Sequence, residues 1–277
     1  MFGRNKTISA NASAVVTGAG SGIGRAFAEE LARRNGAVVC ADINLGTAQE
    51  TADRIVSTGG RAWAVQCDVS VQAEVEALAE QADALLPEPV NLVINNAGVG
   101  VGGKPVGETS MDDWHWTMGI NLWGVIHGCH VFAPRLKAQG YGGIINVAST
   151  ASFAAAPLMG PYSVTKAGVL ALSETLAAET SGTGVNVTVL CPTVVNTNIF
   201  TTGRIDAGIT PLMNRLVELT GVPAEGVALT TLKALDRGQL YVLPQMDARM
   251  IWRAKRYLPS VYTRGAGLLS RLASAKA

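Results

Sequence analysis

The sequence predicts an α/β fold in one domain, with a doubly wound parallel sheet and helices on both of its faces. Short apolar runs alternate with amphipathic helical patterns from residue 12 to residue 243. The runs carry no charged side chains, as is typical of strands buried on both faces. A glycine-rich turn joins the first run to the first helix.

The composition describes a compact globular protein, because 48% of the residues are hydrophobic and only 16% are charged. A net charge of +1 gives no reason to expect binding to nucleic acid. The charge is uneven, however. From Gln245 onward the chain has one acidic residue, Asp247, and several basic residues: Arg249, Arg253, Lys255, Arg256, Arg264, Arg271 and Lys276. We therefore divide the chain into a catalytic domain at 1–244 and a basic C-terminal extension at 245–277.

We expect a cytoplasmic protein without a membrane span. The first twenty residues lack the apolar core of a signal peptide, and the uncharged stretch before Lys166 is broken by glycines and prolines. The cysteines are scattered without metal or redox spacing, so we interpret them as buried thiols: Cys40, Cys67, Cys129 and Cys191. No metal site is expected, since His127 and His130 have no acidic or thiol partner arranged with them.

The first strand, at residues 12–17, leads into the turn TGAGSGIG at Thr17–Gly24 and a helix at 25–35. A strand, a glycine turn and a helix form the context that a dinucleotide-binding turn requires. Glycine lets the backbone approach a pyrophosphate, and the helix N-terminus offers free N–H groups. The sequence therefore predicts a Rossmann-type nucleotide site here.

The second strand, at 37–41, ends at Asp42, which follows Gly24 by 18 residues. At about this spacing an acidic side chain meets the adenosine ribose, where it accepts from the 2′-hydroxyl of NAD and repels the 2′-phosphate of NADP. The alternative is an ordinary helix-capping Asp.

The remaining elements follow in alternation. Strands are expected at 62–67, 90–94, around 144–148, 184–191 and 239–243; helices are expected at 46–57, 71–86, 111–139, 160–180 and 223–236. The helix at 111–139 should be bent or loosened by Gly119, Gly124, Gly128 and Pro134. Residues 197–222 should form a lid over the substrate, with a short helix inside 201–220.

Tyr162 and Lys166 stand four residues apart at the start of the helix at 160–180, so they share one face. A nearby ammonium favours the phenolate and lowers the pKa of a tyrosine toward the range useful for proton transfer. Ser149 follows a buried strand, where a doubly wound sheet places its ligands. The spacing alone also fits a Tyr and a Lys on an ordinary amphipathic helix.

Asn121 lies within the long predicted helix, between Gly119 and Gly124. Asparagine is a poor helix former, so its presence suggests a polar task inside the fold. The alternative is an Asn that faces solvent.

Together these motifs resemble the short-chain dehydrogenase/reductase family in its shorter, single-domain form. The matching residues, which cover nearly the whole chain before Gln245, are TGAGSGIG at Thr17–Gly24, Asp68-Val69, NNAG at Asn95–Gly98, Asn121, Ser149, YSVTK at Tyr162–Lys166 and the segment Pro192–Thr197.

The resemblance implies hydride transfer with NAD, for which the protein positions the groups and moves the proton. It implies that Tyr162 is the general acid/base and that Lys166 lowers its pKa and holds the nicotinamide ribose. Ser149 would bind the substrate oxygen, and Asn121 would support a water relaying protons to Lys166. The cofactor-binding residues it implies are Gly18, Ser21, Gly22, Ile23, Gly24, Asp42, Asp68, Val69, Asn95, Ala97, Gly98, Tyr162, Lys166, Pro192, Val195 and Thr197. It also suggests a homo-oligomer, most often a tetramer.

The chain departs from the family pattern in two places. It has Pro192-Thr193 where members often have Pro-Gly, which should reshape the floor of the substrate pocket. Its basic extension is also longer than that of many members. That extension interleaves basic residues with Trp252, Tyr257 and Leu258, a pattern compatible with an anionic membrane surface. We favour a helix packed on a neighbouring subunit, or a solvated face.

The residues expected around the substrate are mostly apolar: Phe153, Ala156, Leu158, Met159, Val195, Ile199 and Phe200. No arginine is placed by the motifs to clamp a carboxylate. The sequence therefore predicts a hydrophobic secondary alcohol or its ketone as substrate. One alternative is an oxoacyl-thioester reductase, although such enzymes usually prefer NADPH and Asp42 argues against that. Another is a non-catalytic NAD-binding sensor, which the presence of all four catalytic residues disfavours.

Overall fold

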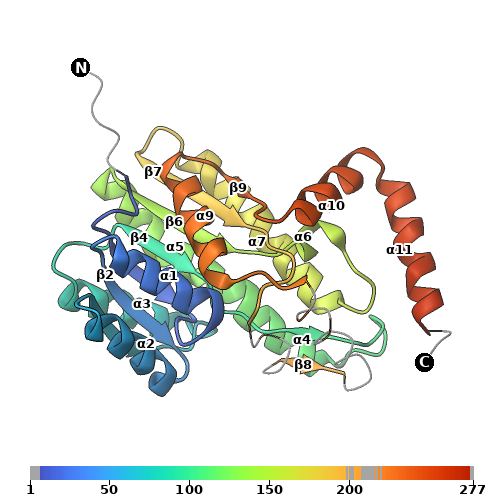
Figure 1. Cartoon of the computed structure of the whole chain (residues 1–277), viewed down its shortest axis with the longest axis horizontal. Coiled ribbons are helices and arrows are strands. Elements are labelled where there is room, and N and C mark those ends of the chain that lie inside the picture. Colours follow the sequence, from blue (N-terminus) through green and yellow to red (C-terminus); the bar gives the residue numbers. More distant parts are fainter. Residues whose placement is uncertain are drawn as a thin grey trace.

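The computed structural model describes residues 7–197, 199, 203–206, 215, 218 and 220–274. At its centre lies a seven-stranded parallel sheet (Figure 1). In spatial order its strands are β3 (Arg61–Gln66), β2 (Ala37–Asp42), β1 (Ser13–Thr17), β4 (Leu92–Asn95), β6 (Gly142–Val147), β7 (Val185–Leu190) and β9 (Tyr241–Val242). Because the chain winds outward in both directions from β1, the predicted doubly wound sheet is confirmed.

The central strands are buried on both faces. Val15 of β1 pairs with Val39 of β2 and with Val93 of β4, and none of the three is exposed to solvent. A strand enclosed in this way can hold only apolar or internally bonded side chains. This explains why the predicted strands read as uncharged runs.

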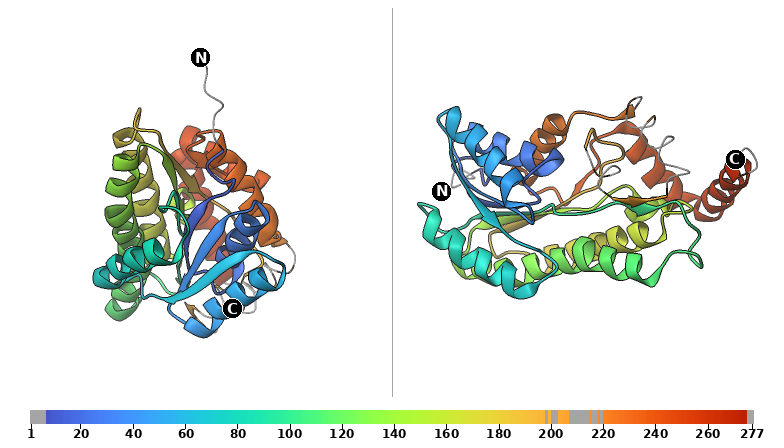
Figure 2. Two further views of the ribbon diagram at one scale, coloured as in Figure 1. Left: turned by 90° about the vertical axis from the view of Figure 1, so that its left-hand side faces the viewer. Right: turned by 90° about the horizontal axis from the view of Figure 1, so that it is seen from below.

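Helices cover both faces of the sheet, as Figure 2 shows edge-on. One face carries α1 (Gly22–Arg33), α2 (Leu45–Ser57) and α9 (Ala224–Asp236); the other carries α3 (Gln72–Leu85), α5 (Gly124–Gln139) and α7 (Gly160–Glu179). On the first face Phe27 of α1 and Leu232 of α9 share one core cluster. On the second, Leu78 of α3 and Phe132 of α5 share another. The apolar residues that recur at helical spacing therefore form the faces by which these helices pack on the sheet.

The predicted helix at 111–139 is continuous but not uniform. It consists of α4 (Met111–Met118), a π-helical turn η1 (Gly119–Trp123) and α5, which contains Pro134. The π turn contains Asn121 and coincides with the expected loosening near Gly119. Such turns widen the helix and occur frequently at functional sites.

Three short elements were not predicted. β5 (Val101–Gly102) pairs in parallel with β8 (Arg204–Ile205) beyond the main sheet, and α6 (Ala151–Ala154) follows β6. A two-residue strand has no periodicity that a sequence pattern could reveal. The short helix expected inside 201–220 falls mostly on residues outside those described.

The basic extension forms two helices, α10 (Met246–Tyr257) and α11 (Pro259–Ser274), and α11 projects away from the sheet (Figure 1). The Nζ atom of Lys255 lies 5.3 Å from the ring centroid of Tyr262, which holds the two helices together. Within the described ranges, no helix combines the length and the apolar character needed to cross a membrane.

Candidate active site

The carboxyl ends of β1 and β4 mark the point where the winding of the sheet reverses. Doubly wound sheets bind ligands at this point because the flanking loops diverge to opposite faces and leave a crevice. The loop after β1 forms one side of the site. The residues that follow β6, together with the start of α7, form the other side.

The turn after β1 accepts only glycine at its key positions. Gly18 has φ +64° and Gly22 has φ +53°, both in the left-handed region that disfavours side chains. A Cβ atom at Gly18 would lie 2.8 Å from Cα of Ala97. A Cβ atom at Gly24 would overlap the carbonyl oxygen of Gly18. The glycines therefore let the turn lie close to the neighbouring loop, and they place no side chains on the outer side of the turn.

The N-terminus of α1 is open to an anion. Its N-cap residue, Ser21, is exposed and its side chain caps no backbone N–H, and no acidic residue lies in the first turn. Free N–H groups and the positive end of the helix dipole therefore face outward. The cradle fits the pyrophosphate of a dinucleotide. Ile23 turns inward and packs on the core.

Thr197 lies over this turn, because a Cβ atom at Gly22 would sit 2.9 Å from its Cγ2 atom. The structure therefore brings the segment after β7 to the glycine turn, although 175 residues separate Gly22 from Thr197 in the sequence.

Asp42, at the end of β2, points to the glycine turn. Its Oδ2 atom accepts a hydrogen bond from the backbone N–H of Gly20 at 2.9 Å, and its Oδ1 atom accepts from the N–H of Asn44 at 3.0 Å. A carboxylate has about four acceptor positions, so capacity remains for a ligand hydroxyl. Asn44, not Asp42, supplies the N-cap of α2, since its side chain accepts from Thr47 N.

The two asparagines of the NNAG segment, Asn95 and Asn96, point in different directions and bind different partners, which the sequence did not reveal. Asn95 turns its side chain into the core, where Nδ2 donates to Oδ1 of Asn146 at 2.8 Å. The Asn95 amide therefore holds the end of β4 to β6, and a contact between Asn95 and the cofactor stays a prediction. Asn96 instead braces the glycine turn, donating to the carbonyl oxygens of Thr17 at 2.9 Å and Gly18 at 3.1 Å. The motif contained Asn96, but this support of the glycine turn was not predicted from it.

The segment after β3 is held against α5. The carboxylate of Asp68 accepts from both the backbone N–H and the hydroxyl of Ser70, at 2.9 and 2.7 Å. The carbonyl oxygen of Val69 lies 2.9 Å from Nδ1 of His127, which gives that histidine a structural partner. These bonds give Asp68 and Val69 a fixed position after β3, and their contact with the cofactor stays a prediction.

The predicted catalytic groups converge on the other side. Lys166 is only 3% exposed; its Nζ atom donates to the carbonyl oxygen of Val147 at 2.9 Å and lies 5.8 Å from the ring centroid of Tyr162. The Ser149 hydroxyl acts on the Tyr162 phenol and lowers its pKa. The strand end and the helix thus bring a hydroxyl, a phenol and an ammonium together.

Burial controls the pKa values in this cluster. It raises the pKa of Tyr162, and the hydrogen bond from Ser149 only partly offsets that rise. It lowers the pKa of Lys166 to about 8. The pKa of Tyr162 thus lies above the ordinary value of a tyrosine, not below it as its pairing with Lys166 predicted. The reason is physical: both groups lose their hydration, and the ammonium lies over the ring and is bonded to Val147.

Asn121 is completely buried and makes two bonds to one residue. Its Oδ1 atom accepts from the N–H of Val99 at 2.7 Å, and its Nδ2 atom donates to the carbonyl oxygen of Val99 at 2.9 Å. The interpretation as a solvent-facing Asn is thus excluded. Gly98 sits between Asn121 and Lys166: a Cβ atom there would lie 3.2 Å from Oδ1 of Asn121 and 3.4 Å from Nζ of Lys166. Asn121 therefore fixes the loop that borders the catalytic lysine.

The segment after β7 is linked to Ser149 and to the C-terminal extension. The carbonyl oxygen of Pro192 accepts from Thr150 N at 2.8 Å and from the Ser149 hydroxyl at 3.5 Å. Thr193, the residue that departs from the family pattern, donates its hydroxyl to Asp247 at 3.1 Å and its N–H to Gln245 at 3.2 Å. The start of α10 thus anchors the loop that lies next to Ser149.

Val195 is buried and forms a parallel bridge with Val222, so it closes the base of the predicted lid. Most of that lid, including Phe200, lies outside the described residues. Its described part is tied to α4: Arg204 pairs with Asp113 at 3.0 Å, and its guanidinium lies 4.2 Å from the ring centroid of Trp116. A hydrogen bond from Ser110 and the pair with Arg204 hold the pKa of Asp113 below its usual range.

Apolar side chains line the entrance to α7 from the loop after α6. Leu158 has φ +64°, which is rare for a side chain of this size, and its carbonyl oxygen accepts from Gly103 N at 2.8 Å. Met159 lies against Gly102 of β5. Residues held in strained backbone conformations gather at functional sites. In the described ranges no three His, Cys, Asp or Glu side chains come close enough to hold a metal, and all four cysteines are buried and unpaired.

Comparisons with known proteins match this arrangement. A family model described as "short chain dehydrogenase" matches residues 12–207. A 1-deoxy-11-beta-hydroxypentalenate dehydrogenase of Streptomyces exfoliatus is 33% identical over 86% of this chain and 84% of its own. A cyclohexanol dehydrogenase of Acinetobacter sp. is 33% identical over 68% of this chain and 74% of its own.

A probable oxidoreductase of Mycobacterium tuberculosis, EphD, is 40% identical over 68% of this chain, but the match spans only 31% of that protein. Among solved structures, a short chain dehydrogenase/reductase from Burkholderia phymatum in complex with NAD has a TM-score of 0.85 and 34% identity, covering 91% of this chain and 95% of its own. A short-chain dehydrogenase from Sphingobium yanoikuyae in complex with NADPH has a TM-score of 0.75 and 27% identity, covering 93% and 94%.

Proposed function

The chain belongs to the short-chain dehydrogenase family, and on that basis we propose that it is an NAD-dependent oxidoreductase that interconverts a hydrophobic secondary alcohol and its ketone. The observation that carries the proposal is the convergence of Ser149, Tyr162 and Lys166 beside the open glycine turn. A hydroxyl donor, an acid/base and a cation at one point are the groups that carbonyl reduction needs.

Tyr162 moves the proton in this mechanism. Burial keeps its phenol neutral at neutral pH, the form that donates a proton to a ketone oxygen. In the reverse direction its oxygen accepts the proton of the alcohol. Ser149 donates a second hydrogen bond to the same substrate oxygen. Bound NAD supplies the hydride acceptor, which is the part of the chemistry that side chains do not provide.

Lys166 and Asn121 support this step. With a pKa of about 8, Lys166 is protonated at neutral pH and stabilises negative charge that develops on the Tyr162 oxygen. We also propose that Lys166 binds the hydroxyls of the nicotinamide ribose of the cofactor. Both polar atoms of the Asn121 side chain are hydrogen-bonded to Val99. We therefore assign the binding of the relay water to the backbone of the π turn that contains Asn121.

The preference for NAD is proposed from Asp42. Its carboxylate stands beside Gly20 of the glycine turn, where it would accept from a ribose hydroxyl and repel a 2′-phosphate. One structural relative was solved with NAD and another with NADPH, so family membership does not decide between them.

The preference for an apolar substrate is proposed from the residues around Tyr162. Phe153 packs on the core beside the cluster, and Leu158 and Met159 lead into α7. Arg204 lies on the lid side, but Asp113 neutralises it. Two relatives are named as dehydrogenases of cyclohexanol and of a hydroxypentalenate, which are alicyclic alcohols.

A homo-oligomer is proposed with the function. Trp123 beside α5 and Val164 of α7 are 51% and 49% exposed, and both lie on the helices through which the family resemblance predicts assembly. Exposed apolar side chains on packed helices are typical of subunit contacts.

The test follows NADH formation with a panel of apolar secondary alcohols, using the native protein and Tyr162→Phe. We expect the variant to lose about 10²–10⁴-fold in kcat, the usual contribution of a positioned acid/base. Tyr257→Phe is the matched control, because Tyr257 is 74% exposed on α10. Equal activity of Tyr162→Phe and the native protein would remove Tyr162 from the mechanism. Faster turnover of charged hydroxy acids than of neutral alcohols would refute the substrate class.

A further inference from the structure

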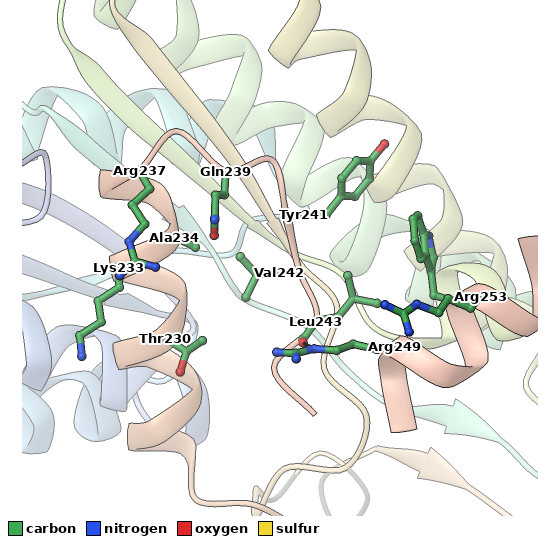
Figure 3. A pocket seen from close by; sticks show the side chains of 11 residues that line it. Thr230, Lys233, Ala234, Arg237, Gln239, Tyr241, Val242, Leu243, Arg249 and Arg253 are labelled. Carbon is green, nitrogen blue, oxygen red and sulfur yellow. Dashed lines mark hydrogen bonds between the residues drawn. The ribbon is translucent and has the colours of Figure 1, made fainter. Parts of the chain in front are cut away.

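A second site lies away from the catalytic cluster, in a cavity of about 430 Å³ between α9, β9 and α10 (Figure 3). Lys233 of α9 and Arg237, which directly follows that helix, stand on one wall, and Arg249 and Arg253 of α10 stand on the opposite wall. None of the catalytic or cofactor residues lines this cavity. The segments on either side of β9 therefore place four cationic side chains around one cavity.

These cations have no anionic partner in the described part of the chain. Lys233, Arg237 and Arg253 form no ion pair there, and Arg249 donates its Nε–H to the carbonyl oxygen of Leu243 at 2.9 Å. The carboxylate at the rim belongs to Glu174, which accepts from the Tyr241 hydroxyl at 2.7 Å. Four positive charges around one cavity repel each other unless an anion is bound between them.

The geometry points to a phosphate group as that anion. Guanidinium groups bind phosphate oxygens through paired N–H donors, and lysine adds a point charge. The hydroxyl of Thr230 and the amide of Gln239 add neutral donors to the same cavity. Three guanidinium groups and one ammonium around one cavity suit a phosphate, whose several oxygens can accept from all of them, better than a carboxylate.

An apolar stripe beside the cavity indicates where the phosphate comes from. On α10 the cationic residues Arg249, Arg253 and Arg256 recur at helical spacing, and so do Met246, Met250 and Tyr257 along the adjacent line. The latter three are 66%, 64% and 74% exposed. A helix with arginines next to exposed apolar side chains matches the pattern of helices that lie in a membrane interface.

The stripe is fixed to the body of the protein. Ala248 is fully buried, Asp247 accepts from Thr193, and the Gln245 amide donates to the carbonyl oxygen of Val194 at 3.1 Å. α10 therefore presents the arginines and the apolar side chains in a constant orientation, as a preformed binding surface does.

We propose that this cavity and the outer face of α10 bind the phosphate headgroup of an anionic phospholipid, so that the protein associates peripherally with an anionic membrane surface. Charge complementarity favours this partner over a second copy of the chain. A two-fold contact through this face would bring two positively charged surfaces together, because each copy contributes Arg249, Arg253 and Arg256, and the repulsion between like charges would oppose it. An anionic surface attracts every one of them.

The experiment uses the full-length protein in sedimentation with vesicles of phosphatidylcholine alone and vesicles that also contain phosphatidylglycerol. We expect binding to the anionic vesicles only, weakening as salt is raised because the charges are screened. The double variant Lys233→Glu/Arg253→Glu should bind on the order of tenfold more weakly. The control Arg61→Glu/Lys137→Glu makes the same change in net charge at exposed positions elsewhere and should bind like the native protein. Circular dichroism and thermal unfolding establish that both variants are folded.

A second arm separates the sources of phosphate. Titration with inorganic phosphate, followed by calorimetry, measures binding without a lipid. Met246→Ser/Met250→Ser should weaken vesicle binding and leave phosphate binding unchanged. Saturable phosphate binding without vesicle binding would overturn the lipid assignment. Equal vesicle binding by the native protein and Lys233→Glu/Arg253→Glu would overturn the site. A dimer that forms through this face, with no vesicle binding, would assign it to a second copy.

Discussion

Replacing Lys166 by Met should abolish catalysis and at the same time stabilise the protein without its cofactor. Burial lowers the pKa of Lys166 to about 8, from about 10.4 in water. That difference corresponds to about 3 kcal/mol of free energy against folding with the charged lysine. Methionine has similar length and no charge, so Lys166→Met removes this cost.

Part of the gain is offset. Val147 loses the hydrogen bond that its carbonyl oxygen accepts from Nζ at 2.9 Å, which costs about 1–2 kcal/mol. The expected net gain at pH 7 is about 1–2 kcal/mol in the free energy of unfolding. For a chain of this size it corresponds to roughly 2–4 °C in Tm per kcal/mol.

The gain should depend on pH with a defined sign. Below pH 8 the lysine is protonated in both the folded and the unfolded chain, so the native protein bears the full cost. Between pH 8 and about 10.4 the folded state releases its proton first, the unfolded state binds more protons, and the stability of the native protein rises. The advantage of Lys166→Met should therefore shrink across this interval.

Urea unfolding at pH 7 and at pH 10, alongside NADH formation, measures both effects. The tyrosines and cysteines that titrate in the same interval are common to both proteins, so their contributions cancel in the difference. Lys137→Met, at an exposed position, is the matched control and should change neither stability nor activity appreciably. A Lys166→Met protein that is less stable than the native one by the same amount at both pH values would refute the reasoning.

Three further predictions concern the cofactor and the substrate loop. Asp42→Ala should shift cofactor preference toward NADP, measured as the ratio of kcat/KM for the two cofactors; Asp53→Ala, on the exposed side of α2, is its control, and an unchanged ratio would remove Asp42 from selection. Gly24→Ala should weaken NAD binding by about tenfold or more, because its Cβ atom would overlap the carbonyl oxygen of Gly18 and force the turn to move. Fluorescence titration with NADH measures this loss, and Gly107→Ala, which would meet nothing within 4 Å, should bind normally. Thr193→Val should cost about 1 kcal/mol in the free energy of unfolding by removing the bond to Asp247, and should raise KM for the alcohol more than it lowers kcat. A change in kcat alone would show that this loop acts on the chemical step rather than on substrate binding.

The fold could be predicted in most of its parts because burial imposes its own pattern on the sequence. Strands enclosed on both faces must be apolar, as Val15, Val39 and Val93 are, and helices on a sheet must repeat their apolar residues every three to four positions. β5 and β8 were missed because a two-residue pairing depends on where the lid lies in space. The π turn at Asn121 was anticipated only as a loosening of the helix, since the neighbouring glycines show weak helix formation without specifying its form.

The candidate site was predictable where its residues are close in sequence or form a dense motif. Tyr162 and Lys166 are one helical turn apart, and the glycines of the first turn have no alternative residue that fits their φ angles. The division of work between Asn95 and Asn96 was not predictable, because successive residues at a strand end point to opposite sides and only the position of the sheet decides which side is the core.

The sequence by itself determined the class of fold and the glycine turn, and it supplied the residues that we propose transfer the proton. Only the tertiary structure decided the pKa values of these groups and the contacts between segments that are distant along the chain. Burial, which no local pattern reports, raised the pKa of Tyr162 and lowered that of Lys166. Chain folding brought Asp247 to Thr193, and Lys233 to the same cavity as Arg253. The physical reason is that desolvation and long-range contacts depend on every element around a residue, whereas a sequence motif records only the neighbours along the chain.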